Sequence, residues 1–256
     1  QPKGTSAPEI NYLCHMSSQF SPGRFEFLPL VVKNIIIINA LFFLATFVLE
    51  NSYGISLIDL LGLHFPAAQD FAIWQPITHL FMHGSFNHIL FNMFSFWMFG
   101  SVLENIWGAK RFLNFYMITG FGAALLHYLI VYFIDLQPVL NNIDLQLATA
   151  SGPSVAYLEA QREAFLNMPN IIGASGAVAG IWIAFAYLFP NSTLYLFFAF
   201  PVKAKYLAAV YVLVELYQAL QFNPRDNVAH FAHLGGMLFG YLIVKYGYNS
   251  DRLRFY

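Results

Sequence analysis

The sequence predicts an all-α, polytopic membrane protein with six transmembrane helices in a single bundle. Three observations support this prediction: the composition, six apolar stretches, and the distribution of cations between them. Of the 256 residues, 58% are hydrophobic and 10% are charged, whereas a soluble domain typically carries about 25% charged residues. The net charge of −1 argues against a nucleic-acid partner, which usually needs a basic face. The lipid bilayer is therefore the expected environment.

Six stretches are apolar and long enough to approach the roughly 20 residues that a membrane crossing needs. In chain order they are Leu30 to Leu49, Phe86 to Leu103, Phe112 to Phe133, Ile171 to Phe189, Leu207 to Phe222 and Val228 to Tyr246. The expected organisation is a polar N-terminal segment at 1–27, a six-helix domain at 28–248 and a short cytoplasmic tail at 249–256.

Cations alternate between the segments that connect these stretches. Lys110 and Arg111 follow the second span, and Lys203 and Lys205 follow the fourth, whereas segment 51–85 contains no Lys or Arg. Because Lys and Arg concentrate on the cytoplasmic side of a membrane, this pattern predicts an even number of spans with both termini in the cytoplasm.

The two long segments on the outer side are 51–85 and 134–170. The first contains Ile55 to Leu63, which suits the membrane interface, and the second contains a predicted amphipathic helix at Ala156 to Leu166. Each segment is either a solvated connector or an element that controls access of substrate, and the sequence leaves both readings open.

Polar side chains inside a membrane are energetically expensive and therefore informative. The second, fourth and sixth spans run in the same direction, so their first residues lie at similar depth, roughly 3–9 Å below the outer edge at 1.5 Å per residue. These starts carry His88 and Asn92, then Ser175, then His230 and His233. His88 and Asn92 are spaced i, i+4 and share a helix face.

Two small-residue patterns predict which spans meet. Gly176 and Gly180 have GxxxG spacing, as do Gly236 and Gly240, and such faces let helix backbones approach closely in a bilayer. The fourth span is therefore expected to pack on the sixth, which brings Ser175 toward the start of the last helix.

Together these residues predict a serine hydrolase site. A serine hydroxyl is a weak nucleophile until a neighbouring base, usually His, takes its proton. Attack on a peptide carbonyl creates an oxyanion that needs preorganised donors, and the Ser175 N–H, the Asn92 amide and the His88 ring are candidates. Taken singly, each feature has a structural reading: a packing surface, a hydrogen-bonded core histidine, or an amide that joins two helices. Their coincidence at one depth on three parallel helices favours catalysis.

From about Phe27 to Tyr246, the chain resembles the rhomboid family of intramembrane serine proteases. The matching strings are Trp74-Gln-Pro-Ile-Thr-His-Leu-Phe-Met-His83, His88-Ile-Leu-Phe-Asn92, Glu104-x-x-x-Gly108-x-x-Arg111, Gly173-Ala-Ser-Gly176, and Ala232-His-Leu-Gly-Gly236 with Gly240. The resemblance implies the minimal six-helix rhomboid bundle and a Ser–His dyad.

Carried over position by position, the resemblance implies that Ser175 is the nucleophile and His233 the general base. It implies that His88 and Asn92 form the oxyanion hole. It also implies that the fifth span and segment 223–227 move to admit substrate.

Three further positions are implied to be structural. His83 matches a position that supports the first loop, and Glu104 and Arg111 match a motif at the inner end of the second span.

Three residues depart from the family pattern. The first loop of the family often carries a Trp-Arg pair, where this chain has Trp74-Gln75. Some members place an aromatic residue on the base, where this chain has Ala179, and some have an Asn one turn before the base, where this chain has His230. His230 could therefore share the proton of His233 or hold a water. The sequence identifies no acid that completes a triad, since Asp226 lies in a loop and Glu215, within the fifth span, is predicted to be an interhelical hydrogen-bond partner.

Three functions are weighed. The favoured one is a protease whose partners are single-span membrane proteins. The second is a non-catalytic rhomboid-like protein that binds membrane clients, although such relatives lack the serine or the base. The third is a metal or proton transporter, suggested by eight histidines, including His79 and His83 at i, i+4 spacing. It is disfavoured because acidic residues are scarce in the spans and no inverted halves are visible.

Several further expectations follow from the sequence. No cofactor and no metal are expected, and the single cysteine, Cys14, allows no internal disulfide. A bacterial inner membrane fits the compact plan, with an organellar membrane as the alternative. The oligomeric state is not specified.

Overall fold

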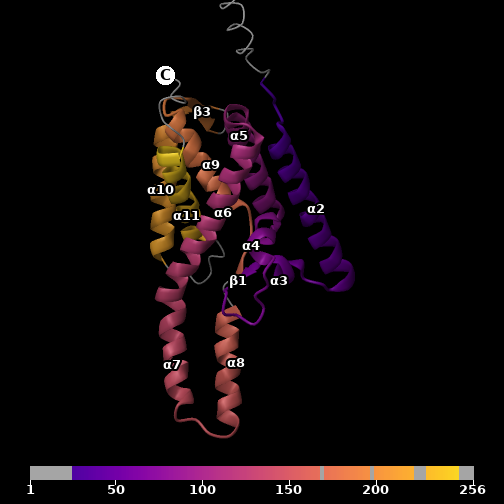
Figure 1. Cartoon of the computed structure of the whole chain (residues 1–256), viewed down its shortest axis with the longest axis vertical. Coiled ribbons are helices and arrows are strands. Elements are labelled where there is room, and N and C mark those ends of the chain that lie inside the picture. The colour runs from indigo at the N-terminus through magenta and orange to yellow at the C-terminus, as the bar shows by residue number, and fades with distance from the viewer. Residues whose placement is uncertain (1–24, 168–169, 197–198, 222–228, 248–256) are drawn as a thin grey trace, which may run out of the picture.

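The computed structural model describes residues 25–167, 170–196, 199–221 and 229–247. Within these ranges the chain is mostly helical, with two short antiparallel strand pairs (Figure 1). Residues 1–24 of the N-terminal polar segment and the C-terminal tail lie outside the described residues. So does segment 222–228, which includes Asp226 and the loop expected to move with the fifth span.

The first three predicted spans are long helices. They are α2 (Leu30–Tyr53), α5 (Phe86–Trp107) and α6 (Ala109–Val131). In the described part of the chain, three helical stretches are long and apolar enough to cross a membrane: Leu30–Tyr53, Phe86–Trp107 and Ala109–Leu147. Large apolar side chains remain exposed along them, such as Leu41 and Phe47 on α2. Lipid is the environment in which so much exposed apolar surface is stable.

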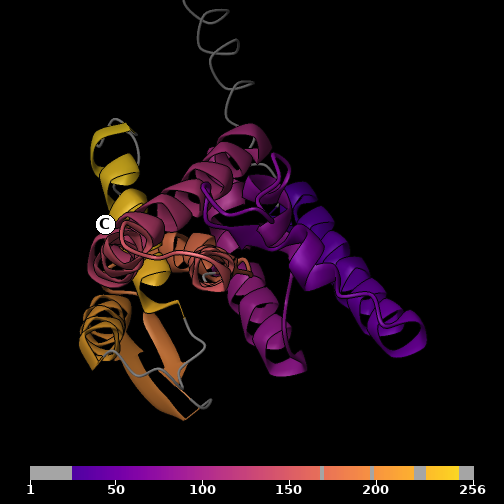
Figure 2. The ribbon, with the colours of Figure 1, turned by 90° about the horizontal axis from the view of Figure 1, so that it is seen from below.

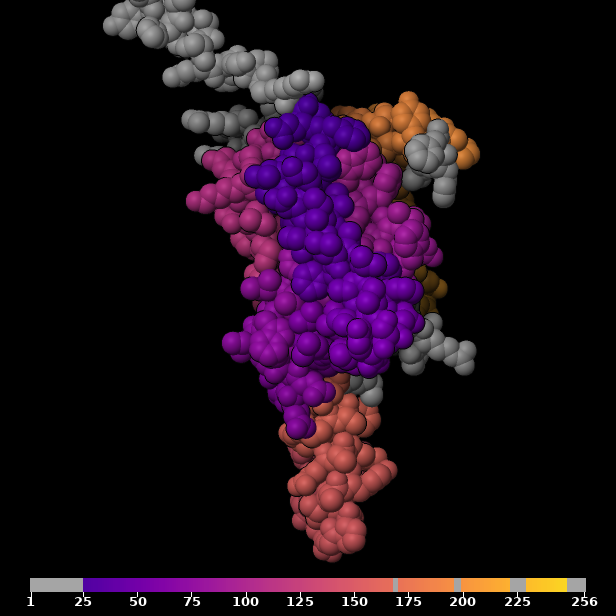
Figure 3. Space-filling model, turned by 90° about the vertical axis from the view of Figure 1, so that its right-hand side faces the viewer, coloured from indigo at the N-terminus to yellow at the C-terminus, as the bar shows by residue number. Residues whose placement is uncertain are grey.

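The third helix is longer than the sequence predicts. It continues from α6 through a π-helical turn at Tyr132–Leu136 into α7 (Gln137–Leu147), and α8 (Pro153–Asn167) returns beside it. The 39-residue stretch is about 58 Å long at 1.5 Å per residue, well beyond a hydrocarbon core of about 30 Å. Figures 1 and 3 show α7 and α8 projecting below the bundle as a hairpin. The expected connector at 134–170 is therefore largely helical, and the predicted helix at 156–166 lies inside α8.

The last three predicted spans correspond to shorter helices: α9 (Ser175–Leu188), α10 (Ala204–Gln221) and α11 (His230–Leu242), which a π-helical turn at Ile243–Gly247 extends. The 14-residue α9 begins inside the protein, because the preceding residues form β2 (Asn170–Ile171), which pairs with β1 (Leu63–His64). Strands β3 (Thr193–Leu196) and β4 (Phe200–Lys203) form a hairpin between α9 and α10 that the sequence analysis did not predict.

The outer segment before α5 is also partly ordered as helix. The interfacial stretch expected at 55–63 contains α3 (Leu57–Leu61) and the start of β1, and α4 (Gln75–Thr78) and a 3₁₀ turn at His79–Phe81 follow.

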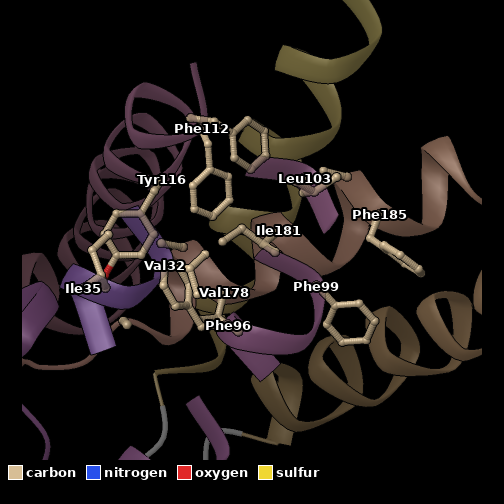
Figure 4. Close-up of a cluster of buried hydrophobic side chains, with 14 of the residues drawn as sticks. Val32, Ile35, Phe96, Phe99, Leu103, Phe112, Tyr116, Val178, Ile181 and Phe185 are labelled. Carbon is tan, nitrogen blue, oxygen red and sulfur yellow. The ribbon is translucent and has the colours of Figure 1, made fainter. Parts of the chain in front are cut away.

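Helix α9 is at the centre of the bundle and packs on α5, α6, α10 and α11. Figure 2 shows α2 and α10 on opposite sides of the molecule. The apolar core is built from aromatic and branched side chains of α2, α5, α6 and α9, including Val32, Phe96, Phe112, Tyr116 and Ile181 (Figure 4).

The predicted packing of the fourth helix on the sixth is confirmed. A Cβ atom at Gly180 would lie 2.8 Å from the Gly236 carbonyl oxygen, and one at Gly240 would lie 2.7 Å from the Gly180 carbonyl oxygen. A Cβ atom at Gly236 would overlap the carbonyl oxygen of Gly176. The two backbones therefore touch along their glycine faces, with no room for side chains between them.

Glu104, near the C-terminus of α5, contacts the N-terminus of α2. Its carboxylate accepts hydrogen bonds from the N–H groups of Val31 at 2.8 Å and Val32 at 2.9 Å. These are first-turn amides of α2, which have no acceptor within their own helix. Arg111, the other residue of the predicted structural motif, lies in the first turn of α6. The Glu104 contacts give a physical reason for an acid at this position.

Candidate active site

A single cavity of about 970 Å³ brings four of the predicted site residues together. His88 and Asn92 reach it from α5, Ser175 from α9 and His233 from α11. Helix α10 also contributes to the wall, through residues such as Val210 and Tyr211. In contrast, His83 and His230 are not among the residues that line this cavity.

The turn before α9 sets the position of Ser175. Gly173 has a φ of +110°, a region that side-chain-bearing residues rarely adopt. Its N–H donates to the His79 carbonyl oxygen at 2.8 Å, which ties the turn to the first outer segment. A Cβ atom at Gly173 would lie 2.8 Å from the His88 ring. Glycine therefore allows His88 to approach the residues just before the serine, and Ser175 becomes the first residue of α9.

Donors for an oxyanion converge on the same cavity. As the first residue of α9, Ser175 has a backbone N–H without an intrahelical acceptor. The Nδ2 amide of Asn92 is buried and has no hydrogen-bond partner in the described part of the chain. Because a buried polar group without a partner is uncommon, this amide is suited to a group that enters the cavity.

The first outer segment supports His88 from behind. Ser85 caps the N-terminus of α5, and its hydroxyl accepts a hydrogen bond from the His88 N–H at 3.2 Å. The rings of His83 and His88 pack edge to face with centroids 4.8 Å apart. Burial lowers the pKa of His83 to about 3, and the neighbouring His88 acts in the same direction. His83 is therefore neutral near pH 7 and lies behind the cavity wall.

His79 joins this segment to the serine turn. Its ring Nδ1 lies 2.9 Å from the Gln75 carbonyl oxygen. A carbonyl oxygen only accepts, so Nδ1 carries the proton. Burial lowers the pKa of His79 to about 4, against weaker opposing hydrogen bonds from the backbone, so this ring is neutral as well.

Gln75, which departs from the family pattern, has a clear structural role. Its side chain is 1% exposed. The side-chain oxygen accepts from the N–H groups of His64 at 3.2 Å and Ala72 at 3.1 Å, and the side-chain nitrogen donates to the Asp70 carbonyl oxygen at 2.9 Å. A neutral amide thus holds the first outer segment together. Ala179, the second departure, is buried and lines the cavity.

The sequence identified no acid near the predicted base, but the structure places Glu215 beside it. Glu215 of α10 lies between two histidines of α11: one carboxylate oxygen is 2.7 Å from Nδ1 of His230, and the other is 3.0 Å from Nδ1 of His233. The prediction that Glu215 is an interhelical hydrogen-bond partner is therefore confirmed, but one of its neighbours is the predicted base. Nothing in the sequence places these side chains on facing sides of two helices.

The same three side chains are the group in the described ranges that could hold a metal ion. Their ligand atoms all lie within 4.8 Å of one another, and two histidines with one carboxylate form a known zinc donor set. The spacings of 2.7 and 3.0 Å are those of direct contact between the side chains. His79 and His83, considered earlier as a metal pair, belong to no such group of three among the described residues.

The fold and cavity define a helical, multi-pass membrane protein with a buried polar site that contains a serine and histidines. Residues 70–250 match the rhomboid domain family. This match covers more than half of the chain, and the chain belongs to the rhomboid family.

Curated relatives support this assignment. The chain is 30% identical over 173 residues to Rhomboid protein 1, mitochondrial, of Saccharomyces cerevisiae, covering 66% of the chain and 41% of the relative. It is 26% identical over 160 residues to RHOMBOID-like protein 12, mitochondrial, of Arabidopsis thaliana, covering 62% and 42%. A 59-residue match of 37% identity to Rhomboid protease GlpG of Haemophilus influenzae covers 22% and 31%. The matches thus cover less than half the length of each of these relatives.

Proposed function

We propose that the chain is an intramembrane serine endopeptidase that hydrolyses peptide bonds in or near the transmembrane helices of membrane-protein substrates. The observation that carries the proposal is the shared cavity: Ser175, His233, His88 and Asn92 come from three helices and line one space of about 970 Å³. Membership of a family that includes named proteases supports the same reading.

The side chains that line the cavity supply the groups that acyl transfer needs. His233 takes the proton of the Ser175 hydroxyl as its oxygen attacks the substrate carbonyl. The resulting oxyanion accepts hydrogen bonds from the Ser175 N–H, the Asn92 amide and the His88 ring. His233 then gives the proton to the leaving amine, and a water, deprotonated by the same ring, hydrolyses the acyl-enzyme.

We further propose that the six predicted spans form a rhomboid bundle that crosses the membrane, with both termini on one side and the cavity open to the other side. Irregular backbone such as the β2 strand and the Gly173 turn is tolerated at membrane depth where protein or a water-filled cavity surrounds it. Relatives with mitochondrial names favour a mitochondrial membrane over the bacterial membrane that the sequence suggested. Fractionation of the tagged chain tests this location.

The decisive experiment compares purified wild type, Ser175→Ala and His233→Ala on a panel of single-span substrates in liposomes. Cleavage is expected in wild type alone. Ser95→Ala is the matched control, because Ser95 lines the same cavity but has no assigned role. A fluorophosphonate should label wild type and Ser95→Ala and spare Ser175→Ala. Label or cleavage retained in folded Ser175→Ala would refute the proposal.

The alternative is a non-catalytic rhomboid-like protein that binds or sorts membrane clients. That function predicts co-purification of a single-span client without cleavage and without fluorophosphonate labelling of wild type. The same panel therefore separates the two functions.

A further inference from the structure

Glu215 occupies an unusual place for an acid. It lies within the apolar α10 helix, is 6% exposed, and points its two carboxylate oxygens at two different histidines of α11. Tyr211, one turn earlier on α10, also lies beside the carboxylate. A buried carboxylate is costly unless it is paired and hydrogen-bonded, so these neighbours explain why it is tolerated.

The contact with His233 has a chemical consequence for the base. An ionised carboxylate only accepts hydrogen bonds, so the ring nitrogen that faces it, Nδ1, is the one that carries the proton. The other nitrogen, Nε2, is then an acceptor, which is the form needed to take a proton from a serine. A carboxylate at this position also stabilises the imidazolium that forms during the reaction.

We propose that Glu215 is a positioning residue for His233, so that the site works as a Ser175–His233–Glu215 triad; this inference rests on the proposed protease function. Nδ1 of His233 lies 3.0 Å from Oε1 of Glu215. The two groups are not aligned as a hydrogen bond, and Nδ1 of His233 has no other hydrogen-bond partner among the described residues. Catalytic hydrogen bonds in unliganded sites are often poorly aligned and tighten with substrate.

His230 holds the acid in place. Its Nδ1 lies 2.7 Å from the second carboxylate oxygen in a well-formed hydrogen bond, which fixes the rotation of the carboxylate. His230 is 7% exposed and does not line the cavity, whereas His233 does. The two histidines therefore have different roles: His233 lines the cavity, and His230 orients Glu215.

The test compares steady-state cleavage by wild type, Glu215→Gln, Glu215→Asp and His230→Asn in liposomes. Glu215→Gln keeps the shape of the side chain but removes the charge. It is expected to lower kcat by about 10²-fold or more with little change in KM, as removal of a triad acid does elsewhere. Glu215→Asp should recover part of the loss, and His230→Asn, which leaves the base and the acid in place, should lose less than Glu215→Gln. Glu50→Gln, which removes a charge from an exposed position on α2, is the matched control and should retain full activity.

A second measurement does not depend on the variants. Nitrogen NMR of labelled histidines in the folded wild-type chain reports which ring nitrogen of His233 carries the proton, and Nδ1 is expected. Full kcat in folded Glu215→Gln, or protonation of His233 on Nε2, overturns the triad while leaving the Ser175 results intact. Cleavage by Ser175→Ala overturns the proposed function itself, so the two failures are distinguishable.

Discussion

Gln75 illustrates how one substituted residue is accommodated at the residue scale. Its side-chain oxygen and nitrogen are both used within the first outer segment, where they bind His64, Ala72 and the Asp70 carbonyl. A larger charged side chain is expected here from the family pattern, yet the buried amide satisfies the backbone groups around it. The segment that positions His79, and through it the serine turn, therefore depends on this amide.

Gln75→Leu should destabilise the protein by about 2–4 kcal/mol, because it leaves buried backbone donors without acceptors and each such group costs about 1–3 kcal/mol. Thermal unfolding in detergent measures the effect. Gln146→Leu, at an exposed position of α7, should change the midpoint little. Equal midpoints for the two variants would contradict the assigned role.

Asn92→Ala tests the oxyanion donor. Loss of one such donor typically lowers kcat by about 10²–10³-fold, and we expect a loss in this range with the fold retained. Asn87→Ala is the matched control, since Asn87 lies on the same helix at the exposed edge of the cavity. Steady-state cleavage over a range of substrate concentrations measures kcat and KM for both variants. A loss confined to KM would assign Asn92 to substrate binding instead.

The candidate site residues were largely predictable, because their chemistry is unusual for a membrane and their helices run in the same direction. The positions of Ser175, His88, Asn92 and His233 along their helices place them at similar depth. Glu215 could not be assigned in this way, since its contact with His233 depends on how α10 is rotated against α11. Hydropathy does not encode that rotation when most faces of a helix are apolar.

At the scale of elements, the α9–α11 contact fixes the distance between the helices that carry Ser175 and His233, the proposed nucleophile and base. The backbones touch where Gly236 faces Gly176 and where Gly240 faces Gly180. Close approach of this kind is supported by van der Waals packing in a bilayer. A methyl group added at the contact must push the helices apart.

Gly236→Ala is therefore expected to reduce cleavage by at least about tenfold, because small displacements of catalytic groups are costly, and to lower the unfolding midpoint. Gly247→Ala is a suitable control, since a Cβ atom there would lie 3.7 Å from the Ile243 side chain, an ordinary contact. Substrate turnover and thermal unfolding would be measured together. Wild-type turnover in Gly236→Ala would show that the contact tolerates separation.

Two elements were not predicted from the sequence, helix α7 and the β3–β4 hairpin, and each can be explained. Helix α7 lies in segment 134–170, for which the sequence left open a solvated connector or an element that controls access of substrate. This helix contains Pro138, a residue that normally interrupts a helix. In the structure, the proline lies just after the π-helical turn at Tyr132–Leu136. Such turns interrupt the regular hydrogen bonding of an α-helix. The β3–β4 hairpin was missed because its short apolar strands resemble the flanks of the adjacent helices.

At the scale of the whole molecule, burial of neutral histidines makes stability depend on pH. His79 and His83 lie outside the membrane-spanning helices, with the pKa of His79 lowered to about 4 and that of His83 to about 3 by burial. An unfolded chain would protonate both near the ordinary value of 6.5. Since the unfolded state binds more protons below that pH, stability is complete above 6.5 and falls as the pH drops toward 4.

The unfolding midpoint in detergent should therefore decline between pH 6.5 and about pH 4. His83→Gln should flatten this decline, because it removes one of the two groups whose protonation favours unfolding. A midpoint that stays constant over this range in wild type, or a decline of equal steepness in the variant, would contradict the explanation.

The projecting hairpin of α7 and α8 also has a practical consequence. Its tip, at residues 148–152, lies far from the bundle (Figure 1). A short epitope inserted there would remain clear of the lipid headgroups, and an antibody added to sealed vesicles would bind only those in which this end faces outward. Sorting vesicles by that mark would test on which face the proposed cleavage releases its products.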